Sequence, residues 1–219
     1  MISGDFSAAW NMGSPARGPA GGQNAADGLG LSRLRPLRLA ALLMLAMAPG
    51  LARAAPPKEV VPLPSSPELG KAEGHCRANE AGPALMVSAV GLKDRVGRLK
   101  LEVYPSNDAD WLQDDNILLY HGKTFRRVEE EVPQTGTPVL CIRVPGPGPY
   151  SVMLLHDRDS NHKFNFRIDG VGFASNPRMG WGKPRAAAAR MVAGQGITRI
   201  NIVLNYFHGL GMSPIHNDD

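Results

Sequence analysis

The sequence predicts an all-β fold, an antiparallel β-sandwich formed by residues 84–207. Three observations lead to this prediction. Apolar and polar residues alternate with a period of two in several short segments. Clusters of Pro, Gly, Asn and Asp interrupt these segments about every ten residues, as turns do between sandwich strands. Only residues 185–192, with their alanine run, resemble a helix; they lack a repeat of large apolar residues, and an irregular or edge strand is the alternative.

The alternation identifies individual strands, beginning near Leu85. Along residues 99–104, leucines and a valine alternate with Lys100 and Glu102 until a Pro-Ser-Asn-Asp cluster ends the pattern. Residues 150–155 are apolar on both faces, which is typical of a central sandwich strand. The other expected strands are residues 140–144 and 200–206, with weaker candidates at 117–120 and 125–128.

The first 54 residues have the organisation of a secretory signal peptide. Three arginines within residues 33–38 precede nine apolar residues, 39–47, and Ala52-Arg53-Ala54 supplies the small residues of a cleavage site. The apolar run is far shorter than the ~20 residues of a spanning helix, and no cysteine follows the cleavage site to carry a lipid. We therefore expect a periplasmic or secreted protein without a transmembrane anchor. The extension before the arginines is unusually long, which suggests a translation start within residues 29–34.

The segments flanking the predicted sandwich are expected to add little to its core. Residues 55–83 are rich in proline, which favours a semi-rigid tether, and residues 208–219 are expected to be a flexible tail. Residues 1–54 hold five arginines and two aspartates, whereas basic and acidic residues nearly balance in the rest. Because the basic excess lies in the leader, no basic stripe is available for phosphates, and nucleic-acid binding is not expected.

Cys76 and Cys141 are the two cysteines of the chain. In an oxidising compartment an even count favours one disulfide, here closing a loop of about 65 residues that is worth ~4 kcal/mol by chain entropy. The alternative, a redox-active thiol pair, usually has the spacing C-x-x-C, which is absent. The cysteines therefore predict a structural disulfide that joins the tether to the domain.

The segment from Asp157 to Asp169, below called the acidic loop, is the sharpest local feature. Asp157, Asp159 and Asn161 reproduce the D-x-[DN]-x-[DN] opening of an EF-hand, a spacing that lets alternate side-chain oxygens converge on calcium. The sixth position is His162 instead of Gly, and the twelfth is Ile168 instead of Glu, with Asp169 one residue later. The alternative is a polar hairpin loop closed by Asx-turns. The candidate metal ligands are Asp157, Asp159, Asn161 and Asp169.

Other polar features carry weaker signals. His156 ends an apolar strand next to the acidic loop and is a candidate base or ligand, although a hydrogen-bonded strand-end histidine is the simpler interpretation. The segment Gly170-Val171-Gly172-Phe173 lacks the flanking strand and helix of a phosphate loop and is expected to be a turn. Asp114-Asp115 and Glu129-Glu130-Glu131 are expected to be solvated. No serine stands in a nucleophile-elbow context.

Several of these motifs together resemble an exported bacterial family, domain of unknown function 2141. Its members carry a Pro-Gly-x-Tyr entry to a strand ending in H-D-x-N-x-N-G, which matches residues 147–150 and 156–162, after two opening strands like residues 86–104. A later G-F-S-N-like segment matches residues 172–176, and the last strand ends in Tyr206. The departures are Asp159 for Asn, His162 for Gly, Asn165 for Asp, and Asp169 for Glu. The resemblance implies a transthyretin-like or prealbumin-like β-sandwich and brings no established activity.

Three classes of function follow from these observations. The first is an exported binding module whose loops recognise an envelope protein or a carbohydrate, favoured because a sandwich without a convergent nucleophile and base is more often a recognition scaffold than an enzyme. The second is a structural accessory protein stiffened by calcium. The third is a hydrolase that uses His156 with Asp157 or Asp159.

Overall fold

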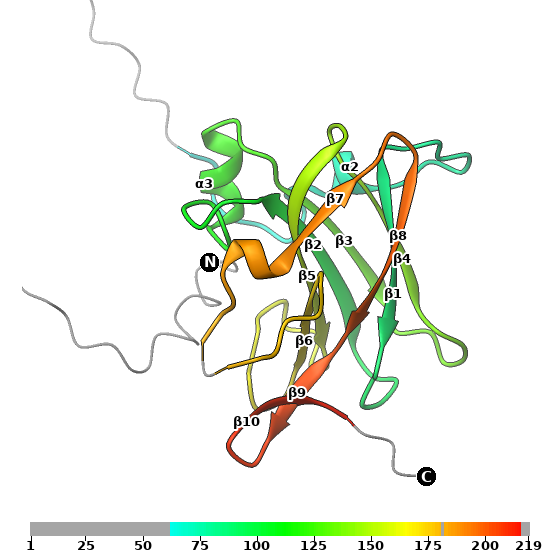
Figure 1. Cartoon of the computed structure of the whole chain (residues 1–219), viewed down its shortest axis with the longest axis vertical. Coiled ribbons are helices and arrows are strands. Elements are labelled where there is room, and N and C mark those ends of the chain that lie inside the picture. The colour runs from blue at the N-terminus through cyan, green and yellow to red at the C-terminus, as the bar shows by residue number, and fades with distance from the viewer. Residues whose placement is uncertain (1–61, 181, 216–219) are drawn as a thin grey trace, which may run out of the picture. The chain divides into compact units, whose positions relative to one another are not determined.

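The computed structural model describes residues 62–180 and 182–215, which form two β-sheets and short helices (Figure 1). The signal peptide expected in residues 1–54 and the start of the tether lie outside these residues. The strands are β1 (Ala84–Val90), β2 (Arg98–Pro105), β3 (Arg126–Glu131), β4 (Val139–Arg143), β5 (Gly148–Asp157), β6 (Gly170–Phe173), β7 (Arg190–Ala193), β8 (Ile197–Val203), β9 (Asn205–His208) and β10 (Gly211–Pro214). The helices are α2 (Lys71–Gly74), α3 (Asp115–Tyr120) and the 3-10 helix η1 (Ala186–Ala189).

The predicted all-β architecture is present, but one sheet is mixed. In the smaller sheet, of order β4-β1-β8, β1 pairs antiparallel with β4 and parallel with β8. The larger sheet has the order β10-β9-β6-β5-β2-β3, and all its pairs are antiparallel. β7 pairs with the beginning of β5. The purely antiparallel prediction therefore needs correction at β8, whose partner β1 lies more than a hundred residues earlier and leaves no local sequence signal.

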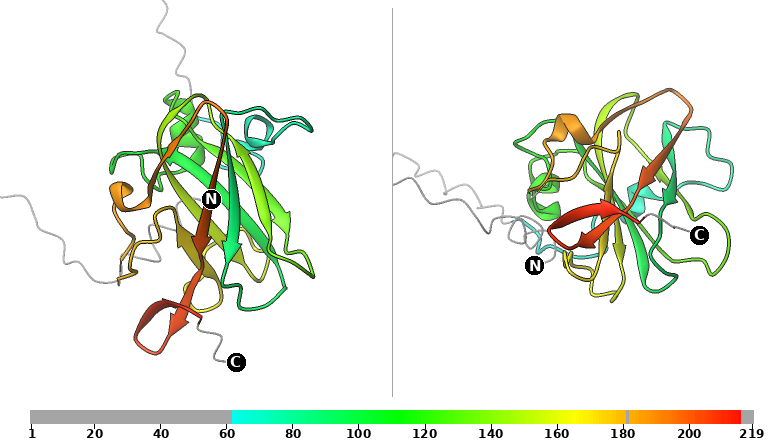
Figure 2. Two further views of the ribbon diagram at one scale, coloured as in Figure 1. Left: turned by 45° about the vertical axis from the view of Figure 1, so that its right-hand side comes forward. Right: turned by 60° about the horizontal axis from the view of Figure 1, so that its bottom comes forward.

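The main hydrophobic core lies between the two sheets. It contains alternate residues of β1 and β2, including Leu85 and Val87 from β1 and Leu99, Leu101 and Val103 from β2, together with apolar residues of β4, β5 and β8. Figure 2 shows the smaller sheet facing the larger one. Because side chains alternate across a strand, the period-two pattern of the sequence places these residues on one face.

The outer face of the larger sheet is also covered. A second core contains Tyr104, Trp111, Phe125 and Phe173, and it is closed by α3 and by the segments around residues 111 and 186. Trp111 stacks edge-on against Tyr104 at 5.2 Å between ring centroids and donates its indole N–H to the Pro184 carbonyl at 2.8 Å. The polar alternates of β2 therefore lie under a layer of protein, and Lys100 and Glu102 are buried.

Four local predictions need correction. Residues 117–120 form part of α3, which buries Leu118 and exposes Tyr120; a short apolar run does not by itself distinguish helix from strand. The expected helix-like segment divides into η1 and β7, so the edge-strand alternative holds for its second half. The expected strand 200–206 divides at Leu204, where the chain leaves the smaller sheet for the larger one. The tail expected from residue 208 contains β10, which pairs with β9 through a turn at Gly209 and buries Met212.

The expected turn at residues 170–173 is strand β6. Gly170 and Gly172 are required there by close packing, because a Cβ atom on Gly170 would collide with the Tyr206 ring and one on Gly172 would lie 2.5 Å from the Val203 carbonyl oxygen. Two glycines within four residues are a turn signal in sequence, but here they admit neighbouring segments to a buried strand.

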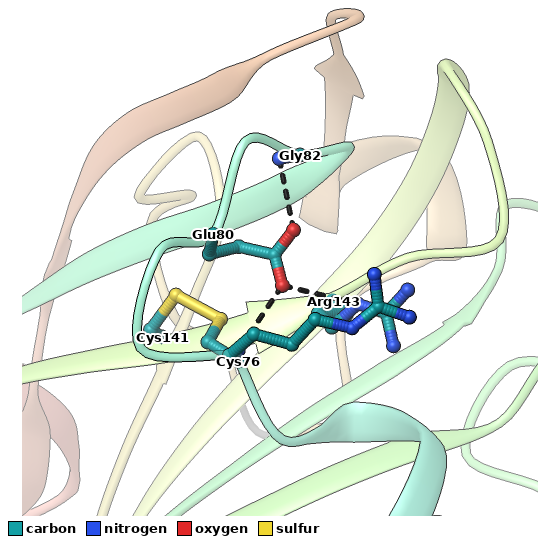
Figure 3. Close-up of a disulfide and its surroundings, with 6 residues drawn as sticks. Cys76, Glu80, Gly82, Cys141 and Arg143 are labelled. Carbon is teal, nitrogen blue, oxygen red and sulfur yellow. Dashed lines mark hydrogen bonds and ion pairs between the residues drawn. A yellow bond between two sulfur atoms is a disulfide. The ribbon is translucent and has the colours of Figure 1, made fainter.

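The described part of the expected tether, residues 62–83, packs on the domain. α2 lies against β3, and His75 forms a bridge with Ile142 of β4. Cys76 and Cys141 form a disulfide with Cα atoms 5.8 Å apart, as predicted (Figure 3). Beside it, Glu80 accepts hydrogen bonds from the amides of Arg77 and Gly82 and pairs with Arg143 at 3.1 Å. Among the described helices, none combines the length and apolar character needed to span a bilayer.

Candidate functional site

The acidic loop connects β5 to β6 and brings three carboxylates together. β5 is buried along its second half and ends at Asp157, while Asp169 immediately precedes β6. Both carboxylates are buried, and Asp159 is exposed. Oxygen atoms of Asp157, Asp159 and Asp169, below called the acidic cluster, all lie within 4.8 Å of one another. This geometry suits a hard cation, which prefers oxygen ligands.

Asn161, the fourth candidate ligand, has a different role. Its Oδ1 accepts a hydrogen bond from the Lys163 amide at 2.7 Å, and its Nδ2 donates to Asp159 Oδ2 at 2.8 Å. The side chain thus closes an Asx-turn and buttresses Asp159. Of the four candidate ligands that the sequence predicts, the structure therefore brings the three aspartates together. The side-chain oxygen of Asn161 instead accepts a backbone hydrogen bond.

Backbone amides hold the two buried carboxylates. Asp157 accepts from the amides of Asn161 and His162 at 3.2 and 2.8 Å. Asp169 accepts from the amides of Arg158 and Asn165 at 3.0 and 2.7 Å. His162 and Ser160 have positive φ angles of 64° and 54°, which turn the chain back over Asp157. The predicted alternative, a loop closed by side-chain-to-backbone hydrogen bonds, is thus present together with the acidic cluster.

The acidic cluster carries unfavourable charge. Burial raises the pKa of Asp169 to about 6; its two amide hydrogen bonds oppose the shift, and the charges of Asp157 and Asp159 add to it. The pKa of Asp157 is also raised, first by burial, against the hydrogen bond from the His162 amide, and further by the neighbouring Asp159. Both shifts mean that the loop assembles its carboxylates at an electrostatic cost, which a bound cation would remove.

His156 is buried next to the cluster and has no free ring nitrogen. The Tyr206 hydroxyl lies 2.7 Å from Nδ1 and the Val96 carbonyl oxygen 2.8 Å from Nε2, while the Lys93 amide donates to the Tyr206 oxygen at 3.1 Å. A neutral imidazole fits this set: Tyr206 donates to Nδ1, and Nε2–H donates to Val96. Burial lowers the pKa of His156, in agreement with the neutral form. The ring is fully shielded from solvent, so the arrangement fastens the β1–β2 turn to the sheet and does not support a hydrolase that uses His156.

Sequence reasoning missed a group of buried charges on the outer face of the larger sheet. Arg127 donates from Nε to Glu102 at 2.8 Å and lies 3.2 Å from Asp115 through Nη2. Lys100 lies 3.7 Å from Glu102, and Tyr104 donates to Glu102 at 2.7 Å. Lys100, Glu102, Asp115 and Arg127 are below called the charge network. All four are buried, which corrects the expectation that Asp115 is solvated.

The structure also contains a pocket that sequence reasoning missed. Its volume is about 350 Å³, and it opens between the segment after β6, the junction of β8 with β9, and β10. The lining residues are Asn176, Pro177, Arg178, Met179, Val203, Asn205, Met212, Ser213 and Pro214. These residues come from three separate segments, so no local spacing in the sequence signals the pocket.

Comparisons with known proteins identify a family. A family model described as an uncharacterized protein conserved in bacteria (DUF2141) matches residues 87–201. No curated protein and no solved structure matches the chain. The matched region covers more than half of the chain and contains both strands that flank the acidic loop. The chain therefore belongs to the DUF2141 family, which confirms the resemblance found in its motifs.

Proposed function

We propose that this protein is an exported binding module whose acidic loop binds a divalent cation, with calcium the preferred ion. The observation that carries the proposal is the convergence of three carboxylates, two of them buried, within 4.8 Å. The raised pKa of Asp169 supports it, because a carboxylate whose charged form is destabilised by burial and by its neighbours gains most from a cation. Calcium accepts six to eight oxygen ligands in flexible geometry, so solvent oxygens would complete a shell that Asp157, Asp159 and Asp169 begin.

The affinity of this site is expected to be weak. The bidentate Glu of an EF-hand is missing, and the Asn161 oxygen is engaged with the Lys163 amide. The cation would join the end of β5 to the start of β6 and stiffen the loops at this end of the sandwich. Loops held by a rigid scaffold are common recognition surfaces, so an envelope protein or a carbohydrate is the proposed partner.

Thermal unfolding of the full chain in calcium and in chelator tests the cation. A ligand bound only by the folded state stabilises it, by ~2.7 kcal/mol at a concentration one hundred times its Kd, so calcium should raise the melting temperature. Asp159→Asn should reduce this rise, because it removes one of the three negative charges from an exposed side chain while keeping its shape and one ligand oxygen. Glu130→Gln, which removes an exposed charge from β3, is the matched control and should keep the rise. An equal rise in Asp159→Asn and wild type would contradict the proposal.

The proposed location is the periplasm or the exterior of the cell. The Cys76–Cys141 disulfide supports it, because disulfides persist mainly in oxidising compartments. N-terminal sequencing of the protein from the cell envelope or medium should begin at or near Ala55, after removal of the proposed signal peptide. Recovery of the uncleaved chain from the cytoplasm alone would contradict export. The transthyretin-like topology implied by the family resemblance is also a proposal, and an experimental structure would test it.

A further inference from the structure

The pocket between β8, β9 and β10 has walls that are held in place without a ligand. Asn176, at a positive φ of 44°, donates from Nδ2 to the Asn201 carbonyl at 3.1 Å and accepts from the Val203 amide at 2.8 Å. These two bonds fasten the segment 176–179 to the free edge of β8. The opposite wall, β10, is held by its ladder with β9. Preformed walls reduce the ordering cost of binding.

The lining combines an apolar floor with a few polar groups, the usual composition of a small-molecule site. Met212 is buried and belongs to the outer core, and Met179 packs against that core, so the floor is continuous with the interior. The other apolar lining residues are Pro177, Val203 and Pro214. Asn205 donates to the Val171 and Val203 carbonyls, which leaves its Oδ1 without a partner among the described residues.

Arg178 supplies the charge at this pocket. It is exposed, and it forms no ion pair with any residue in the described part of the chain. A guanidinium recognises a carboxylate through two parallel N–H···O bonds. No acidic side chain lines the pocket, so no negative charge would repel a ligand carboxylate there.

We propose that this pocket binds a small aromatic carboxylate, with the ring against Met179 and Met212 and the carboxylate on Arg178. A volume of about 350 Å³ corresponds to roughly a dozen water-sized groups at about 30 Å³ each, which matches one aromatic ring with a short acidic side chain. Methionine sulfur makes favourable contacts with aromatic rings, and its flexible side chain adapts to their shape. The site shares no residue with the acidic cluster and does not depend on a bound cation.

The test uses phenylacetate as the probe and the methionine methyl groups of the full chain as NMR reporters. Phenylacetate should shift the methyl signals of Met179 and Met212 and leave those of Met86, Met153 and Met191, outside the pocket, unchanged. The expected Kd is on the order of 0.1–1 mM for a ligand of this size. Phenylacetamide, which is isosteric and neutral, and phenethylamine, which is cationic, should bind more weakly.

Two charge variants separate recognition from general adhesion. Arg178→Gln should weaken phenylacetate binding about three- to tenfold while leaving phenylacetamide binding unchanged. Arg199→Gln, at an exposed position on β8 outside the pocket, should leave both affinities unchanged. The proposal is overturned if phenylacetamide binds as tightly as phenylacetate, if Arg178→Gln has no effect, or if the methionines outside the pocket shift equally.

Discussion

The charge network and the acidic cluster each contain two buried carboxylates on or beside the larger sheet, with opposite electrostatic outcomes. Burial raises the pKa of Glu102, but Lys100, Arg127 and the hydrogen bonds from Tyr104 and Arg127 outweigh it, and the net pKa lies below its usual value. At the end of β5, burial and neighbouring carboxylates raise the pKa of Asp169 to about 6. The difference is the source of positive charge: the network contains Lys100 and Arg127, whereas the acidic cluster consists of carboxylates alone.

His162 joins the two regions. Its amide donates to Asp157 in the acidic cluster, and its carbonyl accepts from Lys100 in the charge network at 3.1 Å. Its ring lies 3.3 Å from Glu129, whose carboxylate also pairs with Lys71 of α2. The acidic loop is therefore held against a buried network in which positive and negative charges balance. The carboxylates of the acidic cluster, which lack such balance, lie directly beside it.

The largest expected effect comes from removing Arg127, the cation of the network that pairs with both of its carboxylates. Arg127→Leu leaves Asp115 buried without its counter-charge and Glu102 with Lys100 as its only remaining cation in the network, which should cost ~3–5 kcal/mol of unfolding free energy in chemical denaturation. Lys123→Leu is the control: Lys123 is half exposed and pairs with Asp110 at 3.5 Å, so its loss should cost no more than ~1 kcal/mol. A cost below ~1 kcal/mol for Arg127→Leu would show that the buried carboxylates do not depend on the charge of Arg127.

An intermediate effect should appear in the pH dependence of stability in chelator. Because the pKa of Asp169 is about 6 in the folded protein, above the ordinary 3.8 of an aspartate, the folded protein binds more protons than the unfolded chain between these two values. Its stability should therefore fall as pH rises from about 4 to 6, by about 1–3 kcal/mol from this group. His156, whose pKa is lowered by burial, acts in the opposite sense, since its contribution is lost as pH falls below about 6.5.

Calcium and Asp159→Asn separate these contributions to the pH profile. Calcium favours the ionised carboxylates and should remove the decline assigned to Asp169. Asp159→Asn should make it slightly shallower in chelator, because burial is the main cause of the raised pKa of Asp169 and the charge of Asp159 adds the least to it. The idea fails if the decline is the same in calcium as in chelator, and the same in Asp159→Asn as in wild type. That result would mean that the three carboxylates of the acidic cluster do not interact as the structure indicates.

The smallest expected effect concerns the residue that joins the two regions. His162 has a positive φ, a conformation that costs a residue with a Cβ atom ~1 kcal/mol relative to Gly. His162→Gly and His162→Ala both remove the contact of the ring with Glu129, but only Gly relieves this cost. His162→Gly should therefore be more stable than His162→Ala by ~1 kcal/mol in thermal or chemical unfolding. If His162→Ala were the more stable variant, the backbone at residue 162 would not have the positive φ seen in this structure.

The predictions from sequence succeeded where local pattern and tertiary environment coincide. The alternation along residues 99–104 matches β2, because one face of that strand meets the smaller sheet. The apolar run 150–155 matches β5, which has neighbours on both sides and on both faces. The glycines of residues 170–173 led to the wrong prediction of a turn. They are needed in a strand because Tyr206 and Val203, more than 30 residues later in the sequence, pack closely against them.

For the acidic loop, the sequence identified the residues and left their roles open. The alternate spacing after β5 was enough to place Asp157 and Asp159 together. The contribution of Asp169 depends on β6 pairing back along β5, which the ladder from Met153 to His156 provides. The role of Asn161 depends on the local turn, in which the Lys163 amide is close enough to capture its oxygen.

By itself, the sequence determined the all-β class, most of the strands, the disulfide partners and the family, because each depends on short-range alternation, motif identity or the pairing of two cysteines. Only the tertiary structure decided which polar residues are buried and which segments meet. Lys100 and Glu102 alternate with leucines as exposed residues would, yet α3 and the segments around residues 111 and 186 supply a second covering layer and Arg127 supplies the compensating charge. The pocket likewise forms from three distant segments. Burial and convergence are properties of contacts between segments far apart in the chain, and a local pattern contains no information about which segments will meet.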